Sequence, residues 1–198
     1  MIILEKALIR KELAQDTDAT FNLLAQLEFL PLAIVQAAAY INANDIQLSN
    51  YTALLHEQEP DVIELLSEHF GDDGRYRDVQ NPVVTTWLIS FQQIQQSSPL
   101  AAEYLSFMAC VNPRDIPQSL LPPECTKKKL EAIGLLKAFA FVSERVQDHA
   151  LSLHRLVYLS TRNWLRQHQQ FTLQIQKTAD QFNDIFPDED QANHDPAV

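Results

Sequence analysis

Residues 30–41 have the sequence Leu30-Pro31-Leu32-Ala33-Ile34-Val35-Gln36-Ala37-Ala38-Ala39-Tyr40-Ile41. Proline suits the first position of a helix, because the N–H that it lacks would be unpaired there in any case. The residues that follow are apolar on every face of a helix, and such a helix has to be buried. We therefore predict a buried helix from Pro31 to about Asn42, whose alanines allow another element to approach closely.

A second informative stretch lies about 120 residues further on, Leu151-Ser152-Leu153-His154-Arg155-Leu156-Val157. Its alternating apolar residues predict a strand that ends at His154, where a new helix begins and continues to about His168. Residues 139–143 predict a partner strand, and the polar residues 144–149 predict the turn of a hairpin. The histidine is thus expected at a junction between a strand and a helix.

The residues before this hairpin predict helices that prolines and caps delimit. We expect a helix from Pro82, a helix that Ser98-Pro99 begins, a short turn near 118–121, and a helix from Lys127 to about Ala138. Thr126 is the expected cap of the last helix, and Leu130, Ile133 and Leu136 are its expected buried residues. Helix, short helix, helix and a two-stranded hairpin follow one another in the order of a winged helix.

The predicted fold is mainly α, because glycines are scarce and prolines fall where helices should end. Residues 1–74 form the expected helical subdomain and residues 79–168 the expected winged-helix subdomain. A trailing helix at 169–186 and a disordered tail at 187–198 complete the prediction. The loop Gly71-Asp72-Asp73-Gly74 marks the expected boundary between the two subdomains.

In this order, the two stretches resemble the helical and winged-helix subdomains of NB-ARC-type signalling NTPases, the STAND class. The chain is most similar to the intracellular NLR-like receptors of filamentous fungi, in which the first helix has the pattern LPLAI-QAAAYI. The resemblance covers roughly residues 20–186 and is strongest at 30–41 and 139–165. It implies a cytoplasmic regulatory protein that senses a nucleotide, with roles in signal transduction, innate immunity and heterokaryon incompatibility.

The resemblance also implies which residues bind the nucleotide. In the family, the proline that corresponds to Pro31 packs on the adenine ring, while backbone groups beside it, near Leu32, recognise the edge of the ring. The histidine that corresponds to His154 contacts the β-phosphate of ADP and holds the closed state. Arg155 replaces the acidic residue of the plant and animal pattern, so it could contact phosphate, pair with an acid or cap the helix. From spacing alone, Pro31 and His154 could equally be ordinary cap residues.

The phosphate-binding half of such an NTPase is not found in this sequence. A P-loop needs glycines before a Gly-Lys-Ser/Thr motif, and the only glycines are Gly71, Gly74 and Gly134. No acidic residue that could serve Mg²⁺ ends an apolar strand. We therefore expect no catalytic residue, no metal site and no enzymatic activity in this chain, and ADP or ATP binding only together with an upstream P-loop domain in cis. Downstream helical repeats and homo-oligomers of the activated state are further expected partners.

The sequence leaves two alternatives to a nucleotide switch, and the first of them comes from the charge distribution. The net charge is −11, but residues 126–170 carry +5, so the lysines at 127–129 with Arg155, Arg162 and Arg166 could form the DNA-binding surface of a winged helix. The acidic flanks repel phosphates, and DNA is not the expected partner. A helical protein-interaction module with no nucleotide role is the other alternative.

No apolar run is long enough for a membrane span, and the two cysteines form no metal or disulfide framework.

Overall fold

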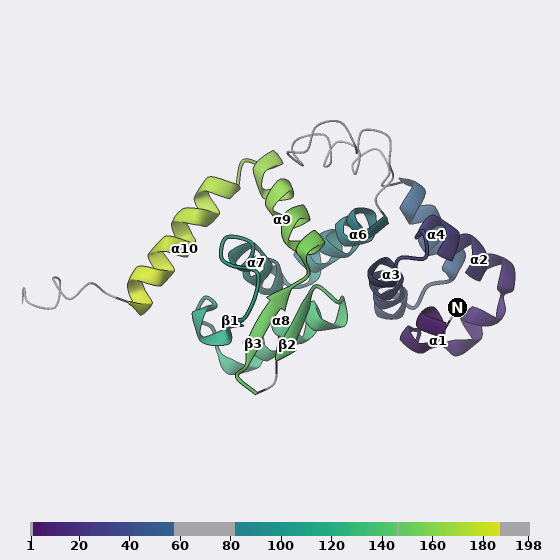
Figure 1. Cartoon of the computed structure of the whole chain (residues 1–198), viewed down its shortest axis with the longest axis horizontal. Helices are drawn as coiled ribbons and strands as arrows, with labels where there is room; N and C mark the ends of the chain where they lie inside the picture. Colours follow the sequence, from purple (N-terminus) through teal and green to yellow (C-terminus); the bar gives the residue numbers. More distant parts are fainter. Residues whose placement is uncertain (1, 58–81, 146, 187–198) are drawn as a thin grey trace, which may run out of the picture.

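The structure is a computed structural model that describes residues 2–57, 82–145 and 147–186. It is mainly helical, with one small sheet (Figure 1). The elements are α1 (Ile2–Ala7), η1 (Lys11–Gln15), α2 (Thr17–Gln26), α3 (Pro31–Asn44), α4 (Leu48–Glu57), α6 (Pro82–Ser97), α7 (Pro99–Met108), β1 (Ile116–Pro117), η2 (Gln118–Leu120), α8 (Thr126–Ala138), β2 (Val142–Arg145), β3 (Ala150–Leu153), α9 (Arg155–Gln167) and α10 (Phe171–Ile185). The predicted boundary at 71–78 and the tail at 187–198 lie outside the described residues.

Helices α1–α4 pack around a first core at one end of the molecule (Figure 1). Local sequence signals delimit these helices. Asp16 caps α2, because its Oδ1 accepts a hydrogen bond from the Ala19 N–H at 3.0 Å. Pro31 is the first residue of α3, as predicted. The residues that line this core therefore come from several short helices that end at polar or proline caps.

Helix α3 is the centre of the first core. Ala33, Ala37 and Ala38 are fully buried, so the small side chains allow the close packing of α3 against α1 and α6. Gln36 is also fully buried. The Thr86 hydroxyl of α6 lies 2.7 Å from Gln36 Oε1 and joins the two helices. The prediction of a buried helix is confirmed.

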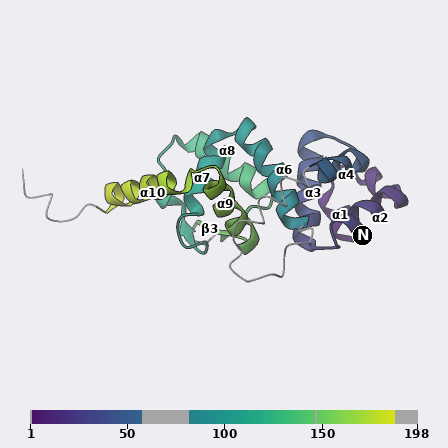
Figure 2. The same cartoon turned by 90° about the horizontal axis from the view of Figure 1, so that it is seen from above.

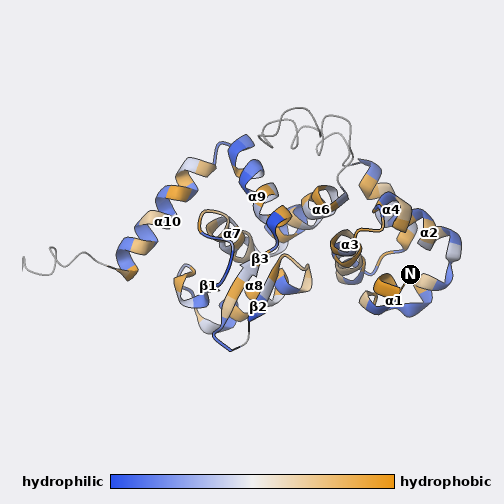
Figure 3. Ribbon diagram, in the orientation of Figure 1, coloured by the Kyte–Doolittle hydropathy of each residue, from blue (hydrophilic) through white to orange (hydrophobic). Residues whose placement is uncertain are grey.

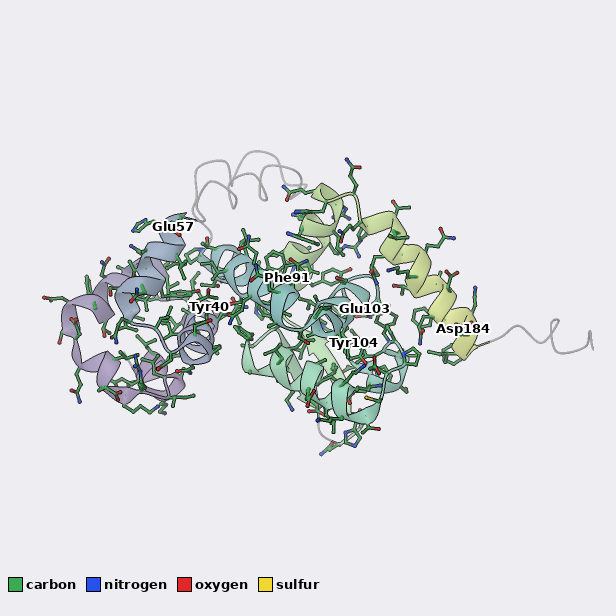
Figure 4. The ribbon with its side chains drawn as sticks, turned by 180° about the vertical axis from the view of Figure 1, so that it is seen from behind. Tyr40, Glu57, Phe91, Glu103, Tyr104 and Asp184 are labelled. Carbon is green, nitrogen blue, oxygen red and sulfur yellow. The ribbon has the colours of Figure 1, made fainter. Side chains whose placement is uncertain are left out.

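A second core lies among α6, α7, α8, α9 and the sheet. Trp87 of α6 is completely buried and stacks on Phe91, with ring centroids 4.8 Å apart. The edge of Trp164 from α9 meets Phe91 at 4.9 Å. Phe91 is labelled in Figure 4, where it lies on α6 near the middle of the molecule. These aromatic rings hold α9 against α6 and so fix the position of the junction before α9.

Helix α6 belongs to both cores, because Val83 and Ile89 pack in the first and the other buried apolar residues of α6 pack in the second. Tyr40 of α3, also labelled in Figure 4, touches both clusters. The division into two subdomains at 74 and 79 stays a prediction. Within the described residues, the two cores are joined through α6.

The sheet has three strands in the order β1-β3-β2, and both pairings are antiparallel. The hairpin of β2 and β3 is present, but β2 spans Val142–Arg145 and not the predicted 139–143, because residues 139–141 form a turn at the end of α8. Strand β1 was not predicted. In β1, Ile116 pairs with Leu151 and Pro117 pairs with Ala150. A strand of two residues that contains a proline has no detectable alternation, and proline is acceptable there because β1 is an edge strand.

Helix α8 differs from the prediction at two positions. Its cap position is Cys125, and Thr126 is already helical. Leu130 is 64% exposed, while Ala132, Ile133 and Leu136 face the core. The predicted spacing was a valid helical pattern, but α7 and β2 contact only one side of α8, and Leu130 lies outside that side.

Helix α10 extends away from the body at the end opposite to α1–α4 (Figures 1 and 2). It contacts α7, α9 and η2, and Thr178 is its only buried residue. Polar and apolar colours alternate along α10 in Figure 3, whereas hydrophobic colour is continuous over much of α3 and α7. The trailing helix is thus present, with large apolar side chains such as Leu173 exposed.

Candidate functional site

His154 lies where the backbone leaves β3 and enters α9. It is the N-cap residue of α9, with the extended backbone angles that this position requires. Its Nδ1 accepts a hydrogen bond from the Leu156 N–H at 3.3 Å. The structure therefore confirms the strand-to-helix junction and the capping role that sequence spacing alone allowed.

This cap also determines where the proton of the neutral imidazole resides. A backbone N–H can only donate, so Nδ1 has to be the unprotonated acceptor. The proton of the neutral ring is then on Nε2. The His154 side chain is exposed, and no protein hydrogen bond to Nε2 occurs within the described residues. The cap bond therefore leaves Nε2–H of His154 as a hydrogen-bond donor for a ligand at the start of α9.

An open pocket of about 500 Å³ lies beside His154. It is lined by Pro113, Arg114, Leu153, His154, Arg155, Tyr158 and Leu159. The Tyr158 hydroxyl accepts a hydrogen bond from Arg162 Nη1 at 2.9 Å, so its own proton is free to donate. The lining thus combines apolar walls with several hydrogen-bond donors and two guanidinium groups.

Arg155 is the first residue of α9 and is exposed at the pocket. No carboxylate of the described ranges lies within ion-pair distance of its guanidinium. Of the three roles open to Arg155 from the sequence, pairing with an acid is therefore not seen in this part of the chain. Capping belongs to His154, and contact of Arg155 with a phosphate stays a prediction.

Pro31 and Leu32 lie in the first turn of α3, and neither lines the pocket around His154. Pro31 is exposed and Leu32 is half-buried. Before them, Glu28 and Phe29 adopt left-handed backbone angles, with φ of 49° and 55°, which is uncommon for residues other than glycine. Phe29 is 53% exposed, and its ring packs edge-on against Phe21 at 6.2 Å. An exposed apolar surface therefore begins at the start of α3.

The first turns of α3 and α9 are linked through the first core. Leu156, two residues after His154, packs against the cluster that contains Ala33 and Ile34. The two predicted sets of nucleotide-binding residues thus lie on helices that share a core, although they do not line one pocket.

The lysines at 127–129 do not form a free basic surface. Lys127 approaches Glu131 at 4.0 Å and Lys128 pairs with Glu124 at 3.4 Å. Lys129 donates to the carbonyl of Gln118, and burial lowers the pKa of its ammonium group. Each of these three lysines thus has a partner within the protein, and the pairs of Lys127 and Lys128 are exposed and weak.

Sequence reasoning missed Arg114 and Tyr158 as residues of the site. Arg114 lies 40 residues before His154 and lines the same pocket because β1 pairs with β3. Tyr158 lies one helical turn after His154, so the periodicity of α9 could have indicated it. Arg114 carried no sequence signal, because β1 itself was not recognisable.

The sequence comparisons identify one much longer relative. No family model and no solved structure matches the chain. A curated protein of Hyaloscypha variabilis, named "Nucleotide-binding leucine-rich repeat (NLR)-like protein", is 45% identical over 188 residues. The match takes in 93% of this chain and spans 19% of that protein. The chain is thus similar to a segment of a much longer protein that is named as NLR-like, and this similarity supports an NLR-like family.

Two kinds of feature, a membrane-spanning helix and a metal site, are absent from the residues that the structure describes. No helix among them is long and apolar enough to cross a membrane. No group of three or more His, Cys, Asp and Glu side chains in this part of the molecule is arranged to hold a metal ion.

Proposed function

We propose that this chain is the regulatory, nucleotide-sensing part of an NLR-like intracellular signalling receptor. In this proposal, residues 79–168 are a winged helix, which the order of α6, α7, β1, η2, α8 and the β2–β3 hairpin supports. The upstream nucleotide-binding domain of the same protein holds ADP, and this chain closes over it. The chain hydrolyses nothing by itself.

The observation that carries this proposal is the orientation of His154. Its Nδ1 is engaged by the first turn of α9, so Nε2–H is the donor that remains for a ligand. The start of a helix is also where the helix dipole favours a negative charge. A phosphate in the pocket would meet Nε2–H, the Arg155 guanidinium and this positive end of α9.

Pro31 and Leu32 are the proposed contacts to the adenine. The proline ring is exposed at the first turn of α3, and the neighbouring Phe29 and Leu30 give this surface an apolar character. An apolar, exposed proline next to free backbone groups suits a flat aromatic base. The upstream domain would cover the same surface in the closed state.

Exchange of ADP for ATP would remove the contact with His154 and release this chain from the upstream domain. A ligand shifts such an equilibrium only by its difference in affinity for the two states. The His154 contact, present with ADP in the closed state, supplies that difference. Reorientation and oligomerisation of the receptor would follow.

Calorimetric titration with ADP tests the proposal. It compares this chain alone with the longer protein that includes the upstream domain. We expect binding only in the longer protein, and weaker binding after His154→Ala. His149→Ala is the matched control, because His149 is highly exposed and lies in the hairpin turn outside the pocket.

Equal ADP affinity in the wild type and in His154→Ala would contradict the proposal and leave a protein-interaction module as the alternative. A salt-sensitive affinity for duplex DNA, lost when Lys127, Lys128 and Lys129 are changed to glutamate, would instead support a DNA-binding winged helix.

A further inference from the structure

Arg114 lies in the turn between α7 and β1, directly beside the end of β3. The Leu153 N–H donates to the carbonyl of Pro113 at 2.8 Å. The Asp115 N–H donates to the Ser152 hydroxyl at 3.0 Å. These bonds continue the antiparallel pairing of β1 with β3 and hold the backbone at Arg114, one of the residues that line the pocket.

The charges of the molecule make this position unusual. Of the 13 Lys and Arg side chains in the described ranges, nine have a carboxylate, a carbonyl, an amide or an aromatic ring as a partner. The cations that lack one there are Lys6, Arg114, Arg155 and Lys177. Two of these four line the pocket of His154, in a chain whose net charge is −11.

The acid next to Arg114 does not neutralise it. Asp115 pairs with Arg145 at 3.2 Å, and Asp148 binds the same guanidinium at 2.7 Å. The carboxylate of Asp115 is thus already paired with an arginine of the β2–β3 hairpin. Arg114 keeps a full positive charge, with its five N–H donors available to a ligand.

We propose that Arg114 is a second anion-binding residue of the His154 pocket, which binds the terminal phosphate of a nucleoside diphosphate together with Arg155. The inference rests on the proposed function. Arg114, in the turn before β1, and His154 and Arg155, at the start of α9, line the same pocket. Guanidinium groups bind phosphate oxygens in pairs with defined geometry, so two of them from separate elements would fix the position of a doubly charged phosphate.

The inference predicts a dependence on the terminal phosphate. ADP should lose affinity when Arg114 is changed, whereas adenosine, which has no phosphate, should not. A hydrogen bond to a charged group contributes enough to expect a loss of roughly 10-fold or more for ADP. Arg114→Lys keeps the charge without the planar fork and should give an intermediate loss.

The test is calorimetric titration of the full-length protein that carries this chain, with ADP and with adenosine. The variants are Arg114→Gln, Arg114→Lys, His154→Ala and the control Lys177→Gln, which removes an unpaired cation from α10. The inference is supported if Arg114→Gln lowers the affinity for ADP at least 10-fold and changes the affinity for adenosine less than 2-fold. The melting temperature of the unliganded protein should stay unchanged.

The other outcomes overturn the inference. If His154→Ala lowers the affinity for ADP and Arg114→Gln does not, the role of Arg114 is refuted and the proposed function stays intact. No effect of either variant would refute both. An equal loss for ADP and adenosine would show that Arg114 supports the fold of the pocket and does not hold phosphate.

Discussion

His154 has two separable roles, a cap for α9 and a donor to a phosphate, and a pair of substitutions can distinguish them. His154→Ala removes both the acceptor Nδ1 and the donor Nε2–H. His154→Ser removes the ring but keeps an oxygen that can accept from the first-turn N–H groups, and serine is a favoured N-cap residue.

The stability of the two variants should differ. The cap bond is long, at 3.3 Å, and exposed, so its loss in His154→Ala should cost about 0.5–1 kcal/mol, the lower part of the range for N-caps. For a protein of this size, the melting temperature should fall by roughly 1–4 °C. His154→Ser should unfold at the wild-type urea concentration. Fluorescence of the buried Trp87 and Trp164 reports the unfolding.

The affinity for ADP should respond differently. A hydrogen bond to a charged group contributes about 1.5–3 kcal/mol. The loss of Nε2–H should therefore lower the affinity for ADP roughly 10- to 150-fold. Because both variants lack the imidazole, both should lose affinity equally in the longer protein. Recovery of ADP affinity in His154→Ser would refute the phosphate contact and show that His154 acts only through the cap. An unchanged stability of His154→Ala would refute the capping argument.

Three further predictions concern the cores and the hairpin. Trp87→Ala should lower the free energy of unfolding by about 3–5 kcal/mol, because the ring is completely buried; urea unfolding measures this, and a loss below about 1 kcal/mol would contradict it. Gln36→Met should be neutral or stabilising in the same assay, since the buried Nε2 of Gln36 has no partner and the Thr86 hydroxyl can still donate to a carbonyl of its own helix at 3.0 Å. The ion pair with Lys137 lowers the pKa of Glu144. Its stabilisation is therefore complete above the ordinary pKa of about 4.3 and is lost as the pH falls through the lower native value. The stability difference between the wild type and Glu144→Gln should shrink on acidification, and a difference that grows would refute this assignment.

The local signals in the sequence predicted most of the secondary structure. Pro31 and Ser98 each begin a helix where a first-position proline or a cap was expected. These signals depend on groups within one helical turn, so neighbouring residues are sufficient to define them. The hairpin and the position of His154 between β3 and α9 were predicted for the same reason.

The misses at β1, Arg114 and Leu130 depended on contacts between segments distant in sequence. Strand β1 is too short to show a pattern, and it exists because β3 lies beside it. Leu130 is exposed because α7 and β2 cover another side of α8. Helical periodicity identifies a set of residues that can share a face, but the neighbouring elements decide which face is buried.

The sequence alone determined the helical class of the protein, the junction at His154 and the resemblance to NLR-like receptors, since caps, prolines and apolar spacing are local properties. Only the tertiary structure decided that Arg114 and His154 line one pocket, that Lys129 binds the carbonyl of Gln118, and that Leu156 of α9 packs against the core of α3. A pocket is formed by side chains from separate elements, and their meeting depends on how the strands pair and how the helices pack. The charge pattern of the site therefore became visible only when β1 was placed beside β3.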